Sequence, residues 1–179
     1  MAAAADTIQN YIRAKDENRP HLMARAFAPT AIVEMKVHAS AISFPPSASG
    51  LDAISDMLVR QFGQTYENIY TFCLAPPPPK KCRNFSCDWL VGMSVKNDGT
   101  VRVGCGRYDW AFTLDGSGLV DKLVITIDVM ATLDPPQLGL VLAWLTKLPY
   151  PWCTPAAVLK DVPTHQALSS LVDRLRKGT

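Results

Sequence analysis

The chain has 179 residues, of which 48% are hydrophobic and 19% charged, a composition that is typical of one folded domain and excludes a largely disordered chain. Its formal net charge of +2 is too balanced for a nucleic-acid binder, so we expect no nucleic-acid partner. The longest apolar stretch, residues 138–145, is far shorter than the roughly 20 residues that span a bilayer, so we expect no membrane partner.

The N-terminus and the cysteines predict the compartment. Residues 1–5 have neither the basic start nor the sustained apolar core of a secretory signal, so we expect no signal peptide. The cysteines have no spacing typical of a disulfide framework or a zinc site, and the chain lacks a P-loop and a dinucleotide-binding motif. We therefore expect reduced thiols, no metal, no cofactor and a cytoplasmic protein. The five cysteines are Cys73, Cys82, Cys87, Cys105 and Cys153.

Helical spacing of apolar residues occurs at three places in the first third of the chain. Residues 2–18 predict a helix, and Pro20 opens a second, shorter one that ends before Pro29, because the residue before a proline avoids the helical region. Residues 51–63 predict a third helix, with Ser49 as its N-cap.

Six segments have the alternation or the β-branched and aromatic composition of strands. They are residues 31–39, 41–44, 66–74, 85–95, 100–114 and 119–132. The turn at Asn97-Asp98-Gly99 and the glycine-rich turn at residues 115–118 join the last three segments, which predicts an antiparallel meander.

The C-terminal region is again helical. We expect residues 1–134 to form the main domain and residues 135–179 to form an extension packed on it, with helices at 138–148 and from Thr164. The proline-rich segment between these helices contains Trp152, which is interpreted as an anchor to the core or, alternatively, as part of a lid over a pocket.

This order of elements resembles the nuclear-transport-factor-2-like superfamily, which includes the SnoaL-like cyclases and the ketosteroid isomerases. The resemblance covers about residues 5–132 and is carried by Tyr11, the run 27–34 and the turn 115–120. It implies an α+β fold, in which a curved antiparallel sheet forms a cone-shaped barrel around the N-terminal helices and leaves one deep pocket. The C-terminal helical tail is an addition to that fold.

The resemblance also implies a homodimer, formed through the convex face of the sheet. The last strand supports this, because alternate residues from Leu123 to Val129 cover one face while Val124 and Met130 make the opposite face partly apolar. A second subunit or the C-terminal tail must then cover that opposite face.

Three residues near the start of the chain are candidates for the pocket. Tyr11 matches the tyrosine that isomerases of this family use to donate to a developing oxyanion, although a core tyrosine is the favoured interpretation. Met35 stands where those enzymes carry an aspartate base and is predicted to contact the substrate, since a thioether cannot take up a proton. His38 is a candidate catalytic residue, but the scytalone dehydratases of the superfamily need two pocket histidines, and this chain offers no obvious second one.

The register of the hairpin at Asn97-Asp98-Gly99 decides which residues of the next strand face the pocket. In one register Trp89 pairs with Tyr108, and Tyr108 and Trp110 face inward. In the other, Trp89 pairs with Arg107, and Arg107 and Asp109 face inward, which would make Asp109 an acid–base residue beside an apolar wall. The first register is favoured because it places the aromatic residues inside, and it leaves Asp109 outside in a salt bridge with Arg107 or a neighbour.

Two classes of function follow from these patterns. The first is a non-catalytic module that binds a hydrophobic small molecule or serves mainly to dimerise. The alternative is a cofactor-independent isomerase, cyclase or dehydratase that acts on a hydrophobic, ring-containing molecule. A carboxylate or histidine inside the pocket would favour the enzyme.

Overall fold

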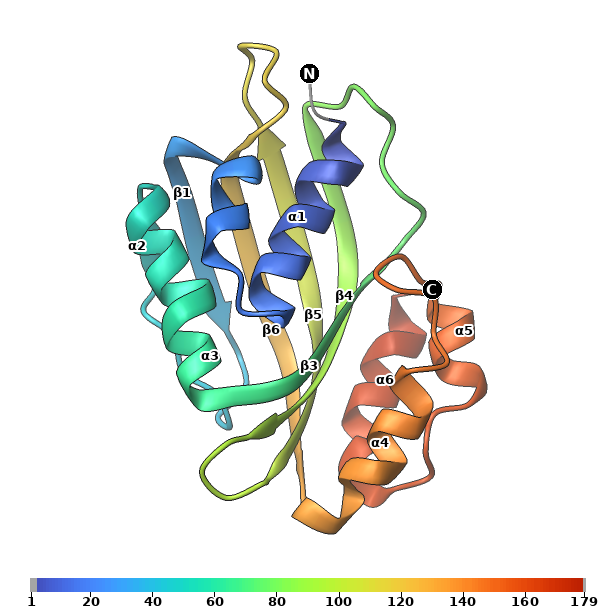
Figure 1. Cartoon of the computed structure of the whole chain (residues 1–179). Helices are drawn as coiled ribbons and strands as arrows, with labels where there is room; N and C mark the ends of the chain where they lie inside the picture. Colours follow the sequence, from blue (N-terminus) through green and yellow to red (C-terminus); the bar gives the residue numbers. More distant parts are fainter. Residues whose placement is uncertain (1–2, 179) are drawn as a thin grey trace.

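A curved six-stranded sheet forms the centre of the computed structural model, which describes residues 3–178 (Figure 1). The strands are β1 (Phe27–Val37), β2 (Ser47–Ser49), β3 (Tyr66–Leu74), β4 (Asn84–Val95), β5 (Val101–Phe112) and β6 (Val120–Leu133). They lie in the order β2-β1-β6-β5-β4-β3, so the sheet has two edges and does not close into a barrel. The expected antiparallel meander of β4, β5 and β6 is confirmed.

The sheet is mixed rather than wholly antiparallel, because β1 and β6 run in parallel. The chain reaches β1 at the end of the sheet where β6 begins, so Phe27 pairs with Val120 and both strands run in the same direction. The strand expected at residues 41–44 is wrong. Pro45 and Pro46 follow it, and proline nitrogens cannot donate to a ladder, so the chain pairs again only at β2.

The N-terminal helices cover the concave face of the sheet (Figure 1). They are α1 (Ala4–Asp16), the 3₁₀-helix η1 (Pro20–Arg25) and a continuous helix made of α2 (Leu51–Ser55), the π-helical turn η2 (Asp56–Arg60) and α3 (Gln61–Thr65). The expected helices are confirmed within the described residues, with two corrections. The second helix ends at Arg25, because Phe27 and Ala28 already belong to β1, and Gly50 rather than Ser49 precedes α2 as its N-cap.

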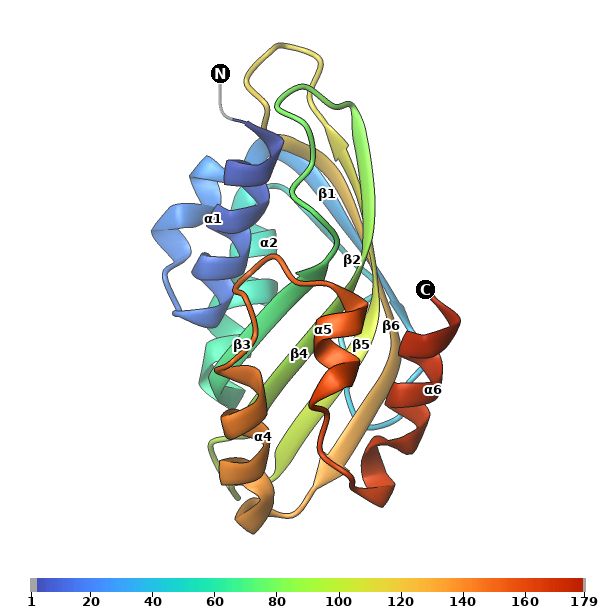
Figure 2. The ribbon, with the colours of Figure 1, turned by 90° about the vertical axis from the view of Figure 1, so that its right-hand side faces the viewer.

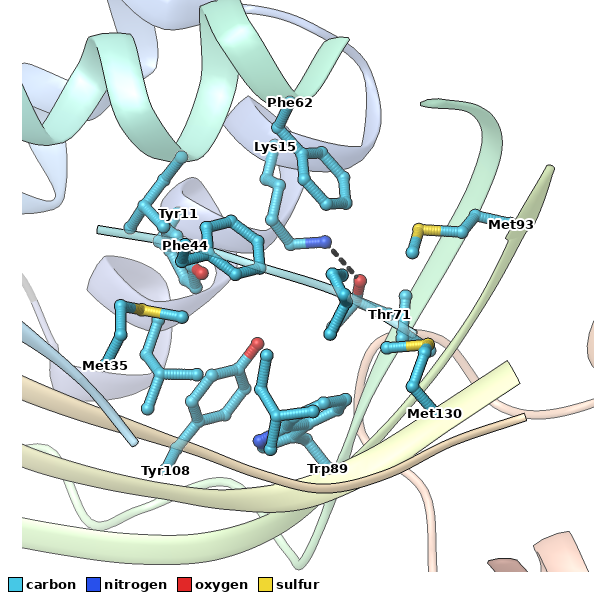
Figure 3. Close-up of a pocket in the computed structure, with 15 residues that line it drawn as sticks. Tyr11, Lys15, Met35, Phe44, Phe62, Thr71, Trp89, Met93, Tyr108 and Met130 are labelled. Carbon is cyan, nitrogen blue, oxygen red and sulfur yellow. Dashed lines mark hydrogen bonds between the residues drawn. The ribbon is translucent and has the colours of Figure 1, made fainter. Parts of the chain in front are cut away.

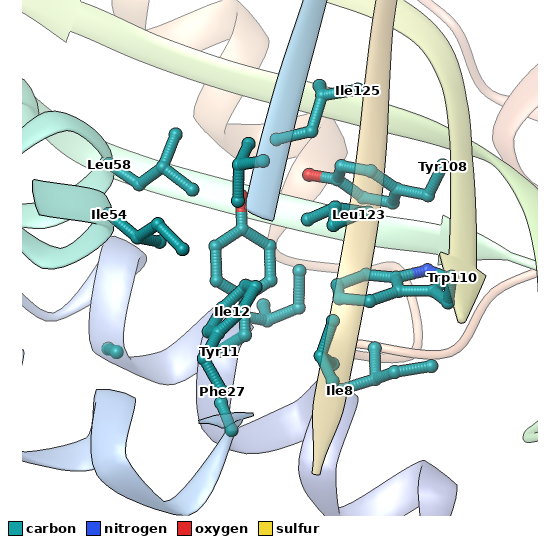
Figure 4. Close-up of a cluster of buried hydrophobic side chains, with 14 of the residues drawn as sticks. Ile8, Tyr11, Ile12, Phe27, Ile54, Leu58, Tyr108, Trp110, Leu123 and Ile125 are labelled. Carbon is teal, nitrogen blue, oxygen red and sulfur yellow. The ribbon is translucent and has the colours of Figure 1, made fainter. Parts of the chain in front are cut away.

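Apolar side chains of the helices and of the concave face form the main core (Figure 4). Tyr11 lies at its centre. Its ring meets Phe27 and Trp110 edge to face, with centroids 5.7 Å and 5.5 Å apart. Offset and edge-on contacts of this kind stabilise aromatic pairs beyond the area that they bury.

The C-terminal tail covers the opposite, convex face (Figure 2). It contains η3 (Pro135–Gln137), α4 (Leu138–Leu145), α5 (Pro155–Lys160), η4 (Gln166–Leu168) and α6 (Ser169–Lys177). A Cβ atom on Gly92 of β4 would lie 2.2 Å from Cδ1 of Leu145, so glycine lets α4 approach the sheet closely. Arg174 of α6 donates to Asp88 on β4 and Asp128 on β6, at 3.0 Å and 2.7 Å. None of the helices within residues 3–178 is long and apolar enough to span a membrane.

The proline-rich segment 150–153 runs beside the edge strand β3. The N–H of Cys73 donates to Pro151 O at 2.7 Å, and the N–H of Cys153 donates to Cys73 O at 3.0 Å. Trp152 packs edge to face on Phe85, with centroids 6.3 Å apart. The interpretation of Trp152 as an anchor is confirmed. The lid interpretation is wrong, since this segment contributes no side chain to the cavity described below.

A β-bulge at Asp128 changes the faces of β6. Cys105 pairs with Val129 and Gly106 with Ile127, so Asp128 is the extra residue. The strict alternation that grouped Val129 with the inward residues and Met130 with the outward ones is therefore wrong: Val129 packs under the tail and Met130 joins the concave core.

Candidate functional site

A cavity lies between the concave face of the sheet and the N-terminal helices (Figure 3). About 430 Å³ of it is free of atoms, including space that is open to solvent, but the centre of a water-sized sphere can occupy only about 40 Å³. Most of its wall is apolar, and Met35, Met93 and Met130 supply three of the lining side chains. Methionine is unbranched and adapts to irregular shapes, so the cavity can widen by changes of rotamer.

Trp89 and Tyr108 both line the cavity, although the hairpin takes a register that the sequence did not suggest. Trp89 pairs with Gly106, and Tyr108 pairs with Cys87. The connection comprises residues 96–99, since the N–H of Val95 still donates to Thr100 O at 2.8 Å. Both expected pairings are wrong, but the observed register differs from the favoured one by two residues. A shift of two keeps every side chain on its face, so the favoured inward face is confirmed.

Asp109 and Arg107 lie on the outer face, away from the cavity. Asp109 exposes 43% of its side chain, and its Oδ1 accepts from Ser86 Oγ at 2.6 Å and from Arg107 Nε at 3.2 Å. The interpretation that placed this pair in the pocket is wrong, because it needed an odd shift in register. The alternative, an outward Asp109 in a salt bridge with Arg107, is confirmed.

His38 also lies outside the cavity. Its side chain is 62% exposed, and its Nδ1 lies 3.2 Å from Oδ1 of Asp128 on β6. The backbone N–H of His38 still donates to Ile127 O at 2.9 Å, so the backbone continues along β6. Val33 and Met35 are buried positions of β1, and alternation therefore places the side chain of His38 on the opposite, outer face. Its placement gives no support to a catalytic role.

Tyr11 and Tyr108 bring their hydroxyl groups toward each other from α1 and β5 (Figure 3). Burial raises the pKa of Tyr11 above its usual value, and a hydrogen bond from Tyr108 acts in the opposite direction. The pKa of Tyr108 is also raised, first by burial and then by the proximity of Tyr11. Both groups are therefore neutral hydroxyls at physiological pH. Because Tyr108 donates to Tyr11, the hydroxyl of Tyr11 keeps its own proton for a hydrogen bond into the cavity.

Trp110 and Met35 complete the comparison with the expected residues. Met35 lines the cavity, as expected. Trp110 is buried on the same face but packs beside Tyr11, outside the lining (Figure 4). The indole N–H groups of Trp89 and Trp110 are buried without a hydrogen-bond partner among residues 3–178.

The polar group that sequence reasoning missed is centred on Lys15. Its Nζ reaches the cavity, where it donates to Thr71 Oγ1 at 2.6 Å and to Asp16 Oδ1 at 2.9 Å (Figure 3). It also lies 4.9 Å from the centroid of Phe62, within the range of a cation–π contact. The signal was present in the sequence: Lys15 follows Ile8 by seven positions and Tyr11 by four, so it continues the buried stripe of the first helix.

Asp16 holds this polar group together beneath the cavity. Its Oδ2 accepts from the backbone N–H of Thr71 at 2.7 Å and from the hydroxyl of Tyr150 at 2.9 Å. Its Oδ1 accepts from the hydroxyl of Thr71 at 2.7 Å as well as from Lys15. The carboxylate thus has partners for all its lone pairs and does not itself line the cavity.

Solved structures with this architecture are known. An NTF2-like superfamily protein from Salmonella enterica serovar Typhimurium is 16% identical, with a TM-score of 0.54, over 70% of this chain and 88% of that one. The chain has the NTF2-like fold. The Δ5-3-ketosteroid isomerase from a Mycobacterium species is 18% identical, with a TM-score of 0.56, over 74% of this chain and all of that one.

A third solved structure with this fold contains a steroid derivative. It is RV0760c from Mycobacterium tuberculosis in complex with estradiol-17β-hemisuccinate, 10% identical, with a TM-score of 0.55, over 70% of this chain and 93% of that one. No model of a protein family and no curated protein matches the sequence. The similarity to these solved structures concerns the fold alone.

Proposed function

We propose that this protein is a non-catalytic module that binds a hydrophobic small molecule in the NTF2-like cavity. The observation that carries the proposal is the composition of the wall: apolar side chains surround the space, and none of the lining residues among residues 3–178 is a carboxylate or a histidine. An apolar cavity with a few polar groups is the usual form of a small-molecule site.

The size of the cavity restricts its ligand. A molecule larger than a few atoms must displace side chains, because little of the space admits even the centre of a water molecule. Met35, Met93 and Met130 can move at low cost. A neighbour of the same fold was crystallised with an estradiol derivative, which supports a ring-containing ligand for this cavity too.

The test is binding of tetralin, an apolar two-ring hydrocarbon, followed by thermal shift. Binding to the folded state raises its stability by RT ln(1 + [L]/Kd), so the midpoint temperature of unfolding should rise with the concentration of tetralin. Val91→Phe fills the cavity and should abolish the shift, whereas Val124→Phe, on the outer face of β6, should preserve it. No shift in the wild type, or an equal shift in both variants, contradicts the proposal.

The alternative is a cofactor-independent isomerase, cyclase or dehydratase. The Tyr11–Tyr108 pair favours it, because neutral hydroxyls in an apolar site can stabilise a developing oxyanion. Met35 in place of a base and the fully bonded carboxylate of Asp16 argue against it. Protein-catalysed exchange of the α-protons of 1-tetralone in D₂O, lost in Tyr11→Phe, would favour the enzyme; no exchange above background supports the binding module.

The homodimer, the cytoplasmic location and the absence of nucleic-acid and membrane partners stay predictions. The C-terminal tail already buries much of the convex face that was expected to mediate the dimer. A dimer would therefore use the part of that face nearer β1, where Ile32 is 41% exposed. Light scattering at micromolar concentration tests this: a mass of about twice 19.6 kDa is expected for a dimer, and a mass of about 19.6 kDa contradicts it.

A further inference from the structure

We propose that Lys15 binds an oxygen acceptor of the ligand, a neutral carbonyl group, and that Tyr150 of the C-terminal tail positions Lys15 for this task. The inference rests on the proposed binding function. It names the ligand class and a positioning residue that lies outside the sheet and the N-terminal helices. It gives the C-terminal tail a role in ligand binding.

Lys15 has a donor to spare. A lysine ammonium carries three N–H donors and no acceptor. Asp16 and Thr71 take two of them, and the nitrogen then faces the ring of Phe62 and the cavity (Figure 3). The side chain of Lys15 is only 7% exposed, so solvent does not compete freely for the remaining donor.

The polar groups next to Lys15, those of Asp16 and Thr71, favour a hydrogen-bond acceptor on the ligand rather than a donor. Both oxygens of Asp16 already accept two hydrogen bonds each. The hydroxyl of Thr71 accepts from Lys15 and donates to Asp16. A ligand that brought another N–H or O–H group here would leave it unpaired, which is costly in an apolar site.

The charge balance favours a neutral ligand. Asp16 lies 2.9 Å from Lys15 and compensates its charge, and the side chain of Asp16 is only 3% exposed. A carboxylate ligand would add a second buried anion beside one cation, and an uncompensated buried charge is strongly unfavourable. A ketone or aldehyde oxygen accepts the spare N–H without changing the charge.

Tyr150 orients the carboxylate of Asp16 from the C-terminal tail. Its hydroxyl donates to Oδ2 of Asp16 at 2.9 Å, and its ring packs edge to face on Phe72, with centroids 5.7 Å apart. This hydrogen bond orients the carboxylate, and the carboxylate orients the ammonium of Lys15. Because Tyr150 is outside the cavity lining, it acts on the ligand only through these two residues.

The experiment compares 1-tetralone with tetralin, which share one skeleton and differ by one carbonyl oxygen. The measured quantity is the ratio of their affinities for the wild type, Lys15→Met, Tyr150→Phe and the control Tyr70→Phe. Tyr70 also packs on Tyr150 but lies outside the polar group. We expect the wild type to prefer 1-tetralone about tenfold, the magnitude of one charge-assisted hydrogen bond.

Lys15→Met and Tyr150→Phe should change the preference, which is measured for each variant relative to its own affinity for tetralin. Lys15→Met should lose the preference, Tyr150→Phe should reduce it about threefold, and Tyr70→Phe should keep it. If circular dichroism shows that Lys15→Met is unfolded, the double variant Lys15→Met/Asp16→Asn, which buries no charge, replaces it.

The outcomes separate this inference from the proposed function. If neither compound binds the wild type, both are overturned. If both bind equally, or if the preference survives without Lys15, the carbonyl assignment is overturned and the binding function stands. If Tyr150→Phe keeps the full preference, or weakens both compounds equally, the positioning role of Tyr150 is overturned.

Discussion

The buried ion pair of Lys15 and Asp16 is the feature at residue scale that most constrains this protein. Both side chains are more than nine-tenths buried, and the carboxylate of Asp16 is satisfied only because Thr71 and Tyr150 supply its remaining hydrogen bonds. Such pairs add little net stability compared with apolar residues, yet the loss of one partner is expensive. The pair is therefore better explained by recognition than by stability.

Asp16→Asn should lower the free energy of unfolding by about 3 kcal/mol, because it leaves the Lys15 charge buried without a counter-ion. Urea denaturation at pH 7 measures the change. Asp109→Asn is the matched control, since Asp109 forms an exposed ion pair and should cost at most about 1 kcal/mol. Equal effects of the two substitutions would contradict the buried ion pair.

The tyrosine pair predicts a loss of stability in alkali. Burial raises the pKa of Tyr11 in the folded protein above the unfolded value of about 10. Its contribution is therefore complete below pH 10 and is lost as the pH rises from there through the folded pKa. Tyr11→Phe should reduce the loss of unfolding free energy between pH 9 and pH 11 by about 1.4 kcal/mol in total, measured by urea denaturation. Parallel curves for wild type and variant would contradict this.

At the scale of elements, the bulge on β6 depends on one glycine of β5. A Cβ atom on Gly106 would lie 1.9 Å from Thr126 O and 2.9 Å from the ring of Trp89. Real Cβ atoms do not approach a backbone oxygen so closely, so a side chain at this position would force the two strands apart. The inward position of Met130 depends on the same bulge.

Gly106→Ala should therefore destabilise the protein by about 3 kcal/mol or more, or prevent its folding. Gly139→Ala provides the control, because Gly139 lies in α4 with no atom within 4 Å of its added Cβ. Alanine there should raise the stability by about 0.5–1 kcal/mol, the usual difference in helix propensity. Thermal unfolding compares the two, and a tolerated Gly106→Ala would show that the bulge can relax.

Most elements could be predicted from the sequence because their signals are local. Apolar periodicity located the first helix, and the turn residues located the meander. The bulge at Asp128 and the parallel pairing of β1 with β6 depend on contacts between distant segments, and no local pattern encodes them. In the site, alternation predicted that Trp89 and Tyr108 would share a face, whereas the role of Lys15 needed Thr71 and Tyr150, which are far away in the sequence.

At the scale of the whole molecule, one sheet carries two cores. The N-terminal helices bury its concave face and the C-terminal tail buries its convex face (Figure 2). The division into residues 1–134 and 135–179 stays a prediction, but both cores share the strands β3 to β6. We therefore expect the two parts to unfold together.

Leu145→Ala tests this expectation, because Leu145 is fully buried between α4 and the sheet. The substitution should cost about 2–5 kcal/mol. Circular dichroism and tryptophan fluorescence should give one coincident transition in urea. Leu140→Ala, in the same helix but 46% exposed, should change the stability by less than about 0.5 kcal/mol. Separate transitions in Leu145→Ala would indicate that the tail melts alone.

The short pairing of residues 150–153 with β3 has a consequence for solubility. Unpaired strand edges act as templates for intermolecular pairing and for amyloid growth. Here β3 is partly occupied by Pro151 and Cys153, and the other edge strand, β2, is only three residues long and follows two prolines. Neither edge strand of the sheet presents a long row of unpaired backbone N–H and C=O groups. Self-association at high concentration must therefore proceed through side-chain surfaces, and the sheet itself is protected against extension by a second chain.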